Sequence, residues 1–459
     1  MAVCGECMAK TRTSYICERC GAESAQWHGK CLVCGEWNTL VEFRVSDLPA
    51  AGARRAPAAA PARVTEVEIA LQERRPTGMN ELDRVLGGGL VPGALILVAG
   101  DPGIGKSTLL LQAANSFAAS HGRGLYVSGE ESLSQAALRS RRLKVLSSEL
   151  LLLAENDVEA IALQVQKLSP HVVVVDSIQA MYSPELKTPP GSVSQVRDCA
   201  ARLLRLAKDL SVPMFLVGHV TKEGALAGPR LLEHMVDTVL SLEGNHHSEY
   251  RVLRSTKNRF GSTDELGLFR MVETGMEAVP DASAALLAER RSDTPGSTVL
   301  AALEGNRSLL LEIQALVAQA APNANPRRSV TGVDYSRTCL ILAVLEKRTG
   351  MALANADVFV NVPGGVRVTE PAADLAVALA IASSHREVPV LADTACVGEM
   401  GLTGEIRAVP RLDRRLSELS RQGFGRCLVP PQARPPAPKG MEVIAVEHVS
   451  DAFRAGLSR

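Results

Sequence analysis

The sequence predicts an α/β protein of three parts: a small cysteine-rich module, a core with a mostly parallel sheet, and a C-terminal α/β domain. Three observations support this fold class. Two C-x-x-C-G motifs lie near the N-terminus, a glycine-rich loop follows the apolar run at 94–100, and further apolar runs alternate with helical patterns. Near-continuous apolar strands of this kind are typical of parallel sheets that are covered on both faces.

The composition sets limits on partners and location. The chain has 459 residues, with 50 Lys and Arg against 50 Asp and Glu, so contacts with a nucleic acid would need local basic patches. No apolar run approaches the ~18 residues of a membrane span, and the first residues lack the apolar region of a signal peptide. We therefore expect a cytoplasmic protein without a membrane partner, whose cysteines are thiols or metal ligands.

The composition also changes along the chain and predicts domain boundaries. Residues 1–43 hold six of the ten cysteines, and residues 44–64 are an Ala-, Pro- and Arg-rich stretch without periodicity, as in a flexible linker. Alternating strand and helix patterns follow in residues 65–289. A turn-rich segment, "RRSDTPGS", begins the last predicted domain, residues 290–459.

The N-terminal cysteines have the spacing of a zinc ribbon. Four thiolates in two C-x-x-C pairs suit tetrahedral Zn²⁺, and the glycine after each pair lets the backbone turn back toward the metal. Two unrelated redox or core pairs are the alternative. Cys4 and Cys7 lack the trailing glycine and stay unassigned, because Met8 is a plausible alternative start. The predicted zinc ligands are Cys17, Cys20, Cys31 and Cys34.

The glycine-rich loop has the pattern G-x4-G-K-S between a strand and a helix, which is typical of a phosphate-binding loop. We expect Lys106 to contact the β- and γ-phosphates of ATP and the Ser107 hydroxyl to bind Mg²⁺. A degenerate loop is the alternative, but no motif residue is missing. The residues expected to contact the nucleotide are Gly100, Asp101, Pro102, Gly103, Ile104, Gly105, Lys106, Ser107 and Thr108.

Polar residues at other strand ends could complete a hydrolytic site. Asp176 ends "HVVVVDS" and is expected to hold the Mg²⁺ shell through water. Glu130 follows "LYVSG", where a carboxylate can orient or deprotonate water, although such an acid can also serve only a helix N-terminus. His219 follows "FLVG" and is expected near the γ-phosphate; an ordinary strand-end histidine is the alternative.

The motif "KNRFG" at 257–261 places two cations, Lys257 and Arg259, in a short segment. Taken alone, a solvated turn would explain it. The segment "PTGMNELDRVLGGGLVPG" at 76–93 resembles the RecA/DnaB/KaiC superfamily. Together with the cysteine motifs and "KNRFG", the chain from Met8 to Arg459 resembles the bacterial RadA (Sms) family of DNA repair proteins.

This resemblance implies a RecA-like core and a DNA-dependent ATPase that acts in homologous recombination and DNA repair. The implied activity is branch migration by a homo-hexameric ring, on single-stranded and branched DNA and alongside the RecA recombinase. A RecA-like, ATP-switched DNA-binding filament and a KaiC-like regulatory ATPase without DNA remain alternatives. The implied cofactors are ATP, Mg²⁺ and Zn²⁺.

The resemblance also suggests catalytic and DNA-binding roles outside the phosphate-binding loop. Lys257 and Arg259 fit a K-x-R finger that reaches the γ-phosphate of the neighbouring subunit; contact with DNA phosphates and a simple turn are the alternatives. The segments after Asp176 and after the strand that ends near 218 would line a DNA channel. In the second of these, Lys222 and Arg230 are candidate DNA contacts.

Residues 298–459 resemble the proteolytic domain of Lon peptidases. The Lon nucleophile lies in a P-S-A-G turn, whereas this chain has Pro371-Ala372-Ala373-Asp374 and no hydroxyl. The partner lysine of Lon lies on the helix after a G-E-x-x-L-x-G segment; here that helix pattern, "RLDRRLSELSRQ", has arginines but no lysine to act as a base. We therefore expect no peptidase activity and a structural or assembly role for this domain.

Overall fold

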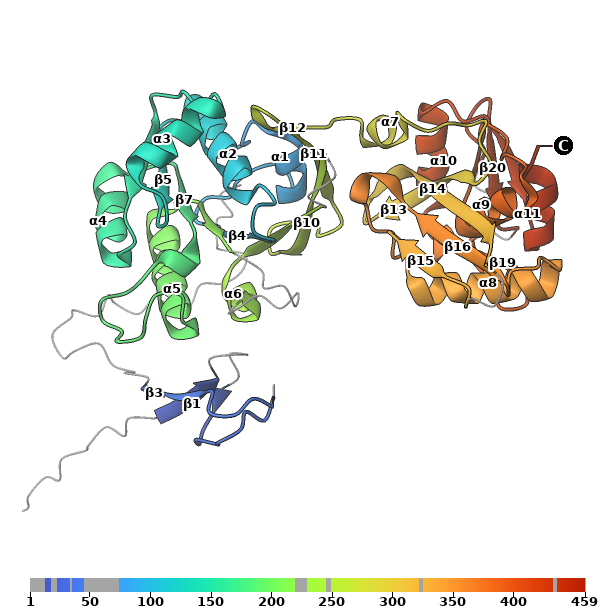
Figure 1. Cartoon of the computed structure of the whole chain (residues 1–459). Helices are drawn as coiled ribbons and strands as arrows, with labels where there is room; N and C mark the ends of the chain where they lie inside the picture. The colour runs from blue at the N-terminus through green and yellow to red at the C-terminus, as the bar shows by residue number, and fades with distance from the viewer. Residues whose placement is uncertain are drawn as a thin grey trace, which may run out of the picture. The chain divides into compact units, whose positions relative to one another are not determined.

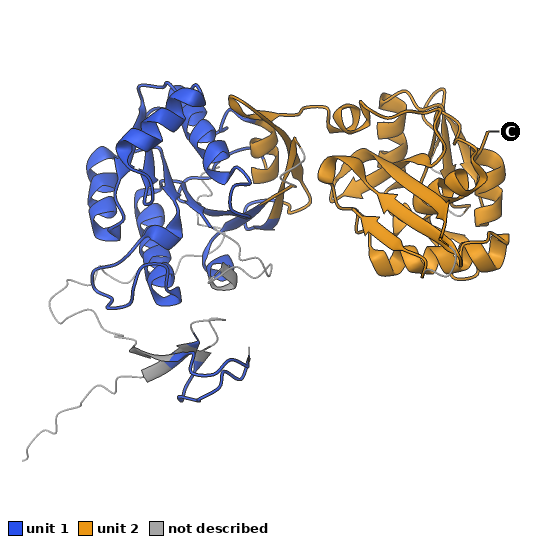
Figure 2. Ribbon diagram, viewed as in Figure 1, with its two compact units in different colours: residues 1–79, 88–241, 256–261 blue, residues 80–87, 242–255, 262–459 orange. Residues whose placement is uncertain are grey.

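The computed structural model describes residues 13–17, 23–33, 35–44, 74–218, 229–244, 249–321, 325–431 and 436–458 (Figure 1). The chain divides into two compact units: residues 1–79, 88–241 and 256–261 form the first, and residues 80–87, 242–255 and 262–459 form the second (Figure 2). In the described ranges, no helix has the length and apolar character required to cross a membrane.

The N-terminal module is a small antiparallel sheet with the order β2-β1-β3. Its strands are β1 (Thr13–Cys17), β2 (Glu23–Ser24) and β3 (Leu40–Arg44). The register of β1 and β3 pairs Cys17 with Leu40. Both residues are buried together with Cys31 in the part of the module that the structure describes.

The first unit contains a sheet with the strand order β9-β4-β8-β7-β5-β6, in which β4, β8, β7, β5 and β6 are parallel. The strands are β4 (Leu95–Gly100), β5 (Gly124–Ser128), β6 (Leu150–Ala154), β7 (Val172–Asp176), β8 (Met214–Val217) and β9 (Thr238–Glu243). The helices are α2 (Lys106–His121), α3 (Leu133–Arg142), α4 (Val158–Leu168), α5 (Val193–Leu210) and α6 (Pro229–Met235), with a 3-10 turn at Ile178–Ala180.

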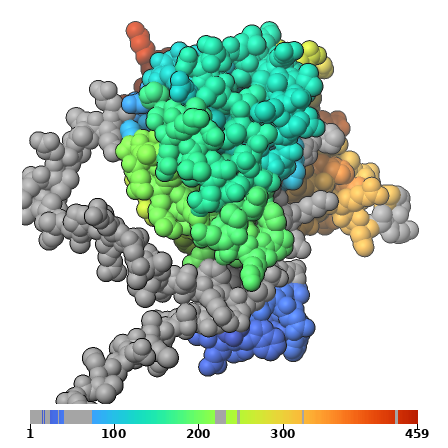
Figure 3. All heavy atoms as spheres, turned by 90° about the vertical axis from the view of Figure 1, so that its left-hand side faces the viewer, coloured from blue at the N-terminus to red at the C-terminus, as the bar shows by residue number. Residues whose placement is uncertain are grey.

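Both faces of this sheet are buried, which explains its non-alternating apolar strands. Leu97, Val127 and Val175 lie in one buried cluster with residues of α4 and α5. Tyr126 and Val174 are equally buried and point to the opposite face, because side chains alternate along a strand. Helix α2 packs against β5 and β7. Figure 3 shows the segments from α3 to α5, in teal and green, covering one side of this unit.

The second unit contains an antiparallel ribbon of β10, β11 and β12, a mixed seven-stranded sheet with the order β15-β16-β14-β13-β17-β20-β21, and a separate antiparallel pair, β18 and β19. The strands are β10 (Tyr250–Asn258), β11 (Leu266–Val272), β12 (Gly275–Ala278), β13 (Ser297–Glu304), β14 (Arg307–Gln319), β15 (Arg328–Thr331), β16 (Ala356–Asn361), β17 (Thr394–Cys396), β18 (Glu399–Met400), β19 (Ile406–Arg407), β20 (Arg426–Val429) and β21 (Glu442–Ala445).

The helices of the second unit are α1 (Asn80–Leu86), α7 (Ala282–Leu287), α8 (Tyr335–Thr349), α9 (Asp374–Arg386), α10 (Leu412–Arg421) and α11 (Val449–Gly456), with 3-10 turns at Pro363–Gly365 and Pro371–Ala373. Helix α9 is buried from Asp374 to Ser383 and packs against β13 and β14. This Ala-rich helix forms the centre of the domain, because small side chains let the sheet approach it closely. The predicted α/β class and the mostly parallel sheet are confirmed.

Candidate active site

The phosphate-binding loop connects the end of β4 to the start of α2. Gly105 precedes the helix with a φ of 115° in the left-handed region, a conformation that favours glycine. Within this described loop, no side chain caps the helix. The first backbone N–H groups of α2 are therefore left for an anion, and this N-terminus fits the phosphates of a nucleotide.

Lys106 begins α2 and is only 4% exposed. Its ammonium group donates to the carbonyl oxygens of Gly100 at 2.8 Å and of Asp101 at 2.9 Å. Burial lowers the pKa of Lys106 to about 8, while the charges of Asp176, Asp101 and Glu130 act to raise it. The lysine is thus held over the loop, among the carboxylates that the sequence assigns to hydrolysis.

Glu130 and Asp176 lie at the same edge of the sheet. The parallel register pairs Ser128 at the end of β5 with Asp176 at the end of β7, and Glu130 follows two residues later. The hydroxyl of Ser177 donates to the Glu130 carboxylate at 2.6 Å. The structure therefore brings together Lys106, Asp176 and Glu130, three of the five residues that the sequence suggests as catalytic.

Two further residues contact Asp176 that sequence reasoning misses. The Tyr126 hydroxyl donates to the Asp176 carboxylate, and Arg139 donates to that hydroxyl at 2.8 Å while lying 3.7 Å from Asp176. Burial and the neighbouring Asp176 charge raise the pKa of Tyr126 well above its usual value. This arrangement fixes the direction of the Asp176 carboxylate at the site.

The Lys257 ammonium group contacts the C-terminal end of α6. It donates to the carbonyl oxygens of Glu233 at 2.6 Å, Val236 at 2.8 Å and His234 at 3.4 Å. Unpaired carbonyls at a helix C-terminus attract cations, so this contact is favourable. Burial, and then the charge of Arg259, lower the pKa of Lys257.

Arg259 lies beside the first residue of β4, whereas the phosphate-binding loop follows the last residue of this strand. Its backbone N–H donates to the Asp237 carbonyl at 3.0 Å, and the backbone N–H of Asp237 donates to the Leu95 carbonyl at 2.9 Å. Leu95 begins β4 and Gly100 ends it, a separation of roughly 17 Å at ~3.3 Å per residue. Arg259 is therefore distant from the phosphate-binding loop of its own chain.

Some predicted residues cannot be placed. His219 and Lys222 lie outside the described residues, and for Arg230 only the backbone of α6 is described. Strand β8, which precedes His219, runs parallel to β4 and pairs Val217 with Val98. The role of His219 near the γ-phosphate and the DNA contacts of Lys222 and Arg230 remain predictions.

The cysteine-rich module offers soft sulfur ligands in one place. Cys17 and Cys31 are 0% and 3% exposed and belong to the same small cluster. The backbone N–H of Gly35 donates to the Cys31 carbonyl at 2.9 Å, and Gly35 has a φ of 74°. This turn has the backbone geometry expected for the second glycine and fits a metal-binding knuckle. Cys20 and Cys34, the other predicted ligands, lie outside the described residues.

Replacing Cys17 with serine should release zinc, because one of four thiolates is lost and serine is a poor ligand for this metal. Metal analysis of the purified variant should find well below one zinc per chain. The control is Cys199→Ser, which should keep its zinc, since Cys199 is buried against the parallel sheet and not in the cysteine-rich module. A full zinc content in the Cys17 variant would contradict this ligand set and would point to Cys4 and Cys7 as ligands.

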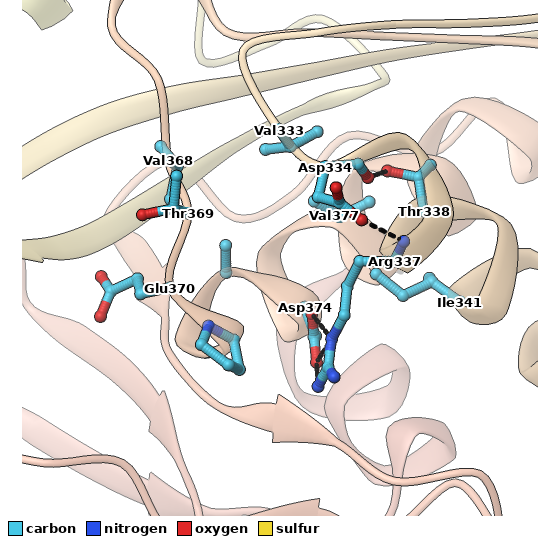
Figure 4. A pocket seen from close by; sticks show the side chains of 12 residues that line it. Val333, Asp334, Arg337, Thr338, Ile341, Val368, Thr369, Glu370, Asp374 and Val377 are labelled. Carbon is cyan, nitrogen blue, oxygen red and sulfur yellow. Dashed lines mark hydrogen bonds and ion pairs between the residues drawn. The ribbon is translucent and has the colours of Figure 1, made fainter. Parts of the chain in front are cut away.

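The turn that would carry a Lon-type nucleophile holds buried apolar side chains. Ala372 and Ala373 are 2% and 5% exposed. The next residue, Asp374, accepts from Arg337 at 3.0 and 3.1 Å, as the dashed lines in Figure 4 show. Burial raises the pKa of Asp374, although Arg337 acts in the opposite direction.

On the other side of this turn, Glu370 forms an ion pair of 2.6 Å with Arg415, which is 0% exposed. A cavity of about 140 Å³ lies beside the turn and is lined by Glu370, Asp374 and Arg337 (Figure 4). Glu370 and Asp374 are thus engaged by arginine side chains, and an arginine cannot serve as a general base. Asp334, which also lines the cavity, accepts from the Arg337 backbone N–H at 2.6 Å. This geometry supports a structural role for the site.

Three family models match successive parts of the chain: a rubredoxin metal binding domain over residues 15–42, an AAA domain over residues 59–225, and subunit ChlI of Mg-chelatase over residues 333–433. A DNA repair protein RadA from Halalkalibacterium halodurans is 50% identical over 98% of this chain and 100% of its own length. DNA repair proteins RadA from Bacillus subtilis and Listeria monocytogenes are 48% and 47% identical, each over 98% of this chain and 100% and 99% of their own lengths.

Proposed function

Because the chain belongs to the RadA family of DNA repair proteins, we propose that it works as a ring-shaped DNA motor whose ATP site is completed by a neighbouring subunit. Family membership and the AAA domain make the chain an ATPase of DNA repair and recombination. Its cofactors are ATP with Mg²⁺ in the AAA domain and Zn²⁺ in the N-terminal ribbon.

The position of Arg259 carries this proposal. A cation that stabilises the transition state of phosphoryl transfer must lie close to the γ-phosphate. Arg259 is at the opposite end of β4 from the phosphate-binding loop, yet 57% of its side chain is exposed. An exposed arginine on the far side of the core suits contact with the nucleotide of another copy of the chain, as in a head-to-tail ring.

Each residue of the site then has a defined task. The backbone N–H groups at the start of α2 bind the phosphates, and Lys106 leaves its carbonyl partners to contact the β- and γ-phosphates. Glu130 orients the attacking water and accepts its proton, while Asp176 and Ser107 hold the metal shell. Bound Mg²⁺ supplies positive charge to the phosphates.

The proposed partners are single-stranded and branched DNA, with the RecA recombinase acting alongside, and the proposed assembly is a homo-hexamer. That the relatives are DNA repair proteins supports a DNA partner. The balanced charge of the chain means that DNA must contact local cations, for which Lys222 and Arg230 are the candidates.

The proposed function predicts that DNA stimulates ATP turnover. The steady-state ATPase rate should rise several-fold with single-stranded DNA and further with a forked substrate, because DNA in the ring would align each finger with the next site. Electron microscopy of the same samples should show closed rings of six subunits. Equal ATPase rates without DNA, with single-stranded DNA and with the forked substrate would contradict the DNA motor. Open filaments with DNA-stimulated turnover would favour the filament alternative.

A further inference from the structure

Asp237 is a buried acid between α6 and β9, and it is 3% exposed. One oxygen of its carboxylate, Oδ2, accepts from the Leu95 backbone N–H at 3.0 Å and from the Lys208 ammonium group at 2.7 Å. A neutral acceptor would satisfy the Leu95 N–H equally well. The buried negative charge is therefore explained by the cations around it.

The second oxygen, Oδ1, faces Arg259. The guanidinium group of Arg259 lies 3.7 Å from it, and the Arg259 backbone N–H donates to the Asp237 carbonyl at 3.0 Å. Asp237 thus contacts Arg259 through both its side chain and its backbone. The guanidinium group is held on its inner side while more than half of the side chain is exposed.

Lys208, which contacts Asp237, also contacts Phe260, the residue after Arg259. Its ammonium group lies 5.6 Å from the centre of the Phe260 ring, and Arg74 donates to the Phe260 carbonyl oxygen. Asn258 accepts from the Phe260 backbone N–H at 2.9 Å and closes the turn. These contacts hold the residues on both sides of Arg259, and the Asp237 carboxylate is in contact with its side chain.

We propose that Asp237 is a positioning residue for Arg259: its carboxylate fixes the direction of the guanidinium group at the subunit surface, ready for the γ-phosphate of the neighbouring subunit. This inference rests on the proposed function of Arg259 as a finger acting in trans. Preorganisation of this kind matters because a catalytic cation misplaced by about 1 Å can lose a factor of 10² in rate.

The variant Asp237→Asn distinguishes the role of Oδ1, which faces Arg259, from that of Oδ2, which accepts from Leu95. Its amide oxygen can take the place of Oδ2 and accept from Leu95, so its NH₂ group then faces Arg259, donor against donor. DNA-stimulated kcat should fall about 10- to 100-fold, with ATP affinity and particle size unchanged. Asp209→Asn, on the exposed end of α5, is the matched control and should keep normal turnover.

A double variant tests whether Asp237 acts through Arg259. Asp237→Asn combined with Arg259→Ala should be no slower than Arg259→Ala alone, because the group to be positioned is already missing. If the Asn variant does not fold, Asp237→Thr takes its place, since a hydroxyl can also accept from Leu95.

Three results would overturn the inference, and they are distinguishable. Normal turnover in Asp237→Asn, with an inactive Arg259→Ala, would remove the positioning role and leave the proposed function intact. A double variant that loses the full product of both factors would show that Asp237 acts elsewhere. Normal turnover in Arg259→Ala would overturn the trans finger itself and, with it, the inference.

Discussion

Replacing Lys106 with alanine should reduce ATP hydrolysis by at least about 10²- to 10³-fold. The lysine is the buried cation of the phosphate-binding loop, and its ammonium group lies over the Gly100 and Asp101 carbonyls where the phosphates would bind. Without it, the negative charge that develops on the transferring phosphoryl group loses a preorganised partner. The measurement is the steady-state release of phosphate at saturating ATP and DNA.

A matched control is Lys167→Ala, which removes an exposed lysine at the end of α4. This variant should hydrolyse ATP at the normal rate, because Lys167 is remote from the loop in sequence and lies on a solvated face. Thermal unfolding of both variants should show intact folding. Normal turnover in a folded Lys106→Ala protein would contradict the assignment of the phosphate-binding loop.

Replacing Arg259 with alanine should reduce DNA-stimulated ATP turnover by about 10³-fold. This factor is the lower end of the range of rate effects for arginine fingers. ATP binding should be unchanged, because Arg259 is at the other end of β4 from the loop of its own chain. Lys257→Ala should have the same pattern. Binding is measured by titration with a fluorescent ATP analogue, and turnover by phosphate release.

Arg270→Ala is the control for this prediction. Arg270 is an exposed arginine on β11, and its ion pair of 3.3 Å with Glu277 lies on a solvated surface, where such pairs contribute little. This variant should keep both binding and turnover. A loss of ATP affinity in Arg259→Ala would contradict action in trans, because the arginine would then serve the nucleotide of its own subunit or support the fold.

Four strands of the parallel sheet, β4, β5, β7 and β8, were predictable from the sequence because each is a near-continuous apolar run followed by residues with a predicted role at the site. "HVVVVDS" gives both strand β7 and Asp176 at its end, and the glycines of the loop predict the start of α2. The hairpin of β13 and β14 could also have been predicted. Its two-residue turn, Gly305 and Asn306, is the usual signal for a tight connection.

The contacts around Asp176 and Arg259 could not be predicted, because they depend on packing between distant segments. Arg139 is one of several arginines on α3, and only the docking of that helix brings it to Tyr126. Asp237 and Arg259 are 22 positions apart, and no periodicity relates them. Their contact follows from the way that the residues after α6 meet the start of β4.

The central claim, that each ATP site is completed by Arg259 of another subunit, is tested most directly by mixing two inactive variants. Lys106→Ala subunits retain the finger, and Arg259→Ala subunits retain the phosphate-binding loop. Where a Lys106→Ala subunit donates its finger to an Arg259→Ala subunit, the site between them is complete. We predict that DNA-stimulated ATP turnover reappears in the mixture and is highest near equal amounts. Variants that assemble together but show no activity at any ratio would contradict the claim.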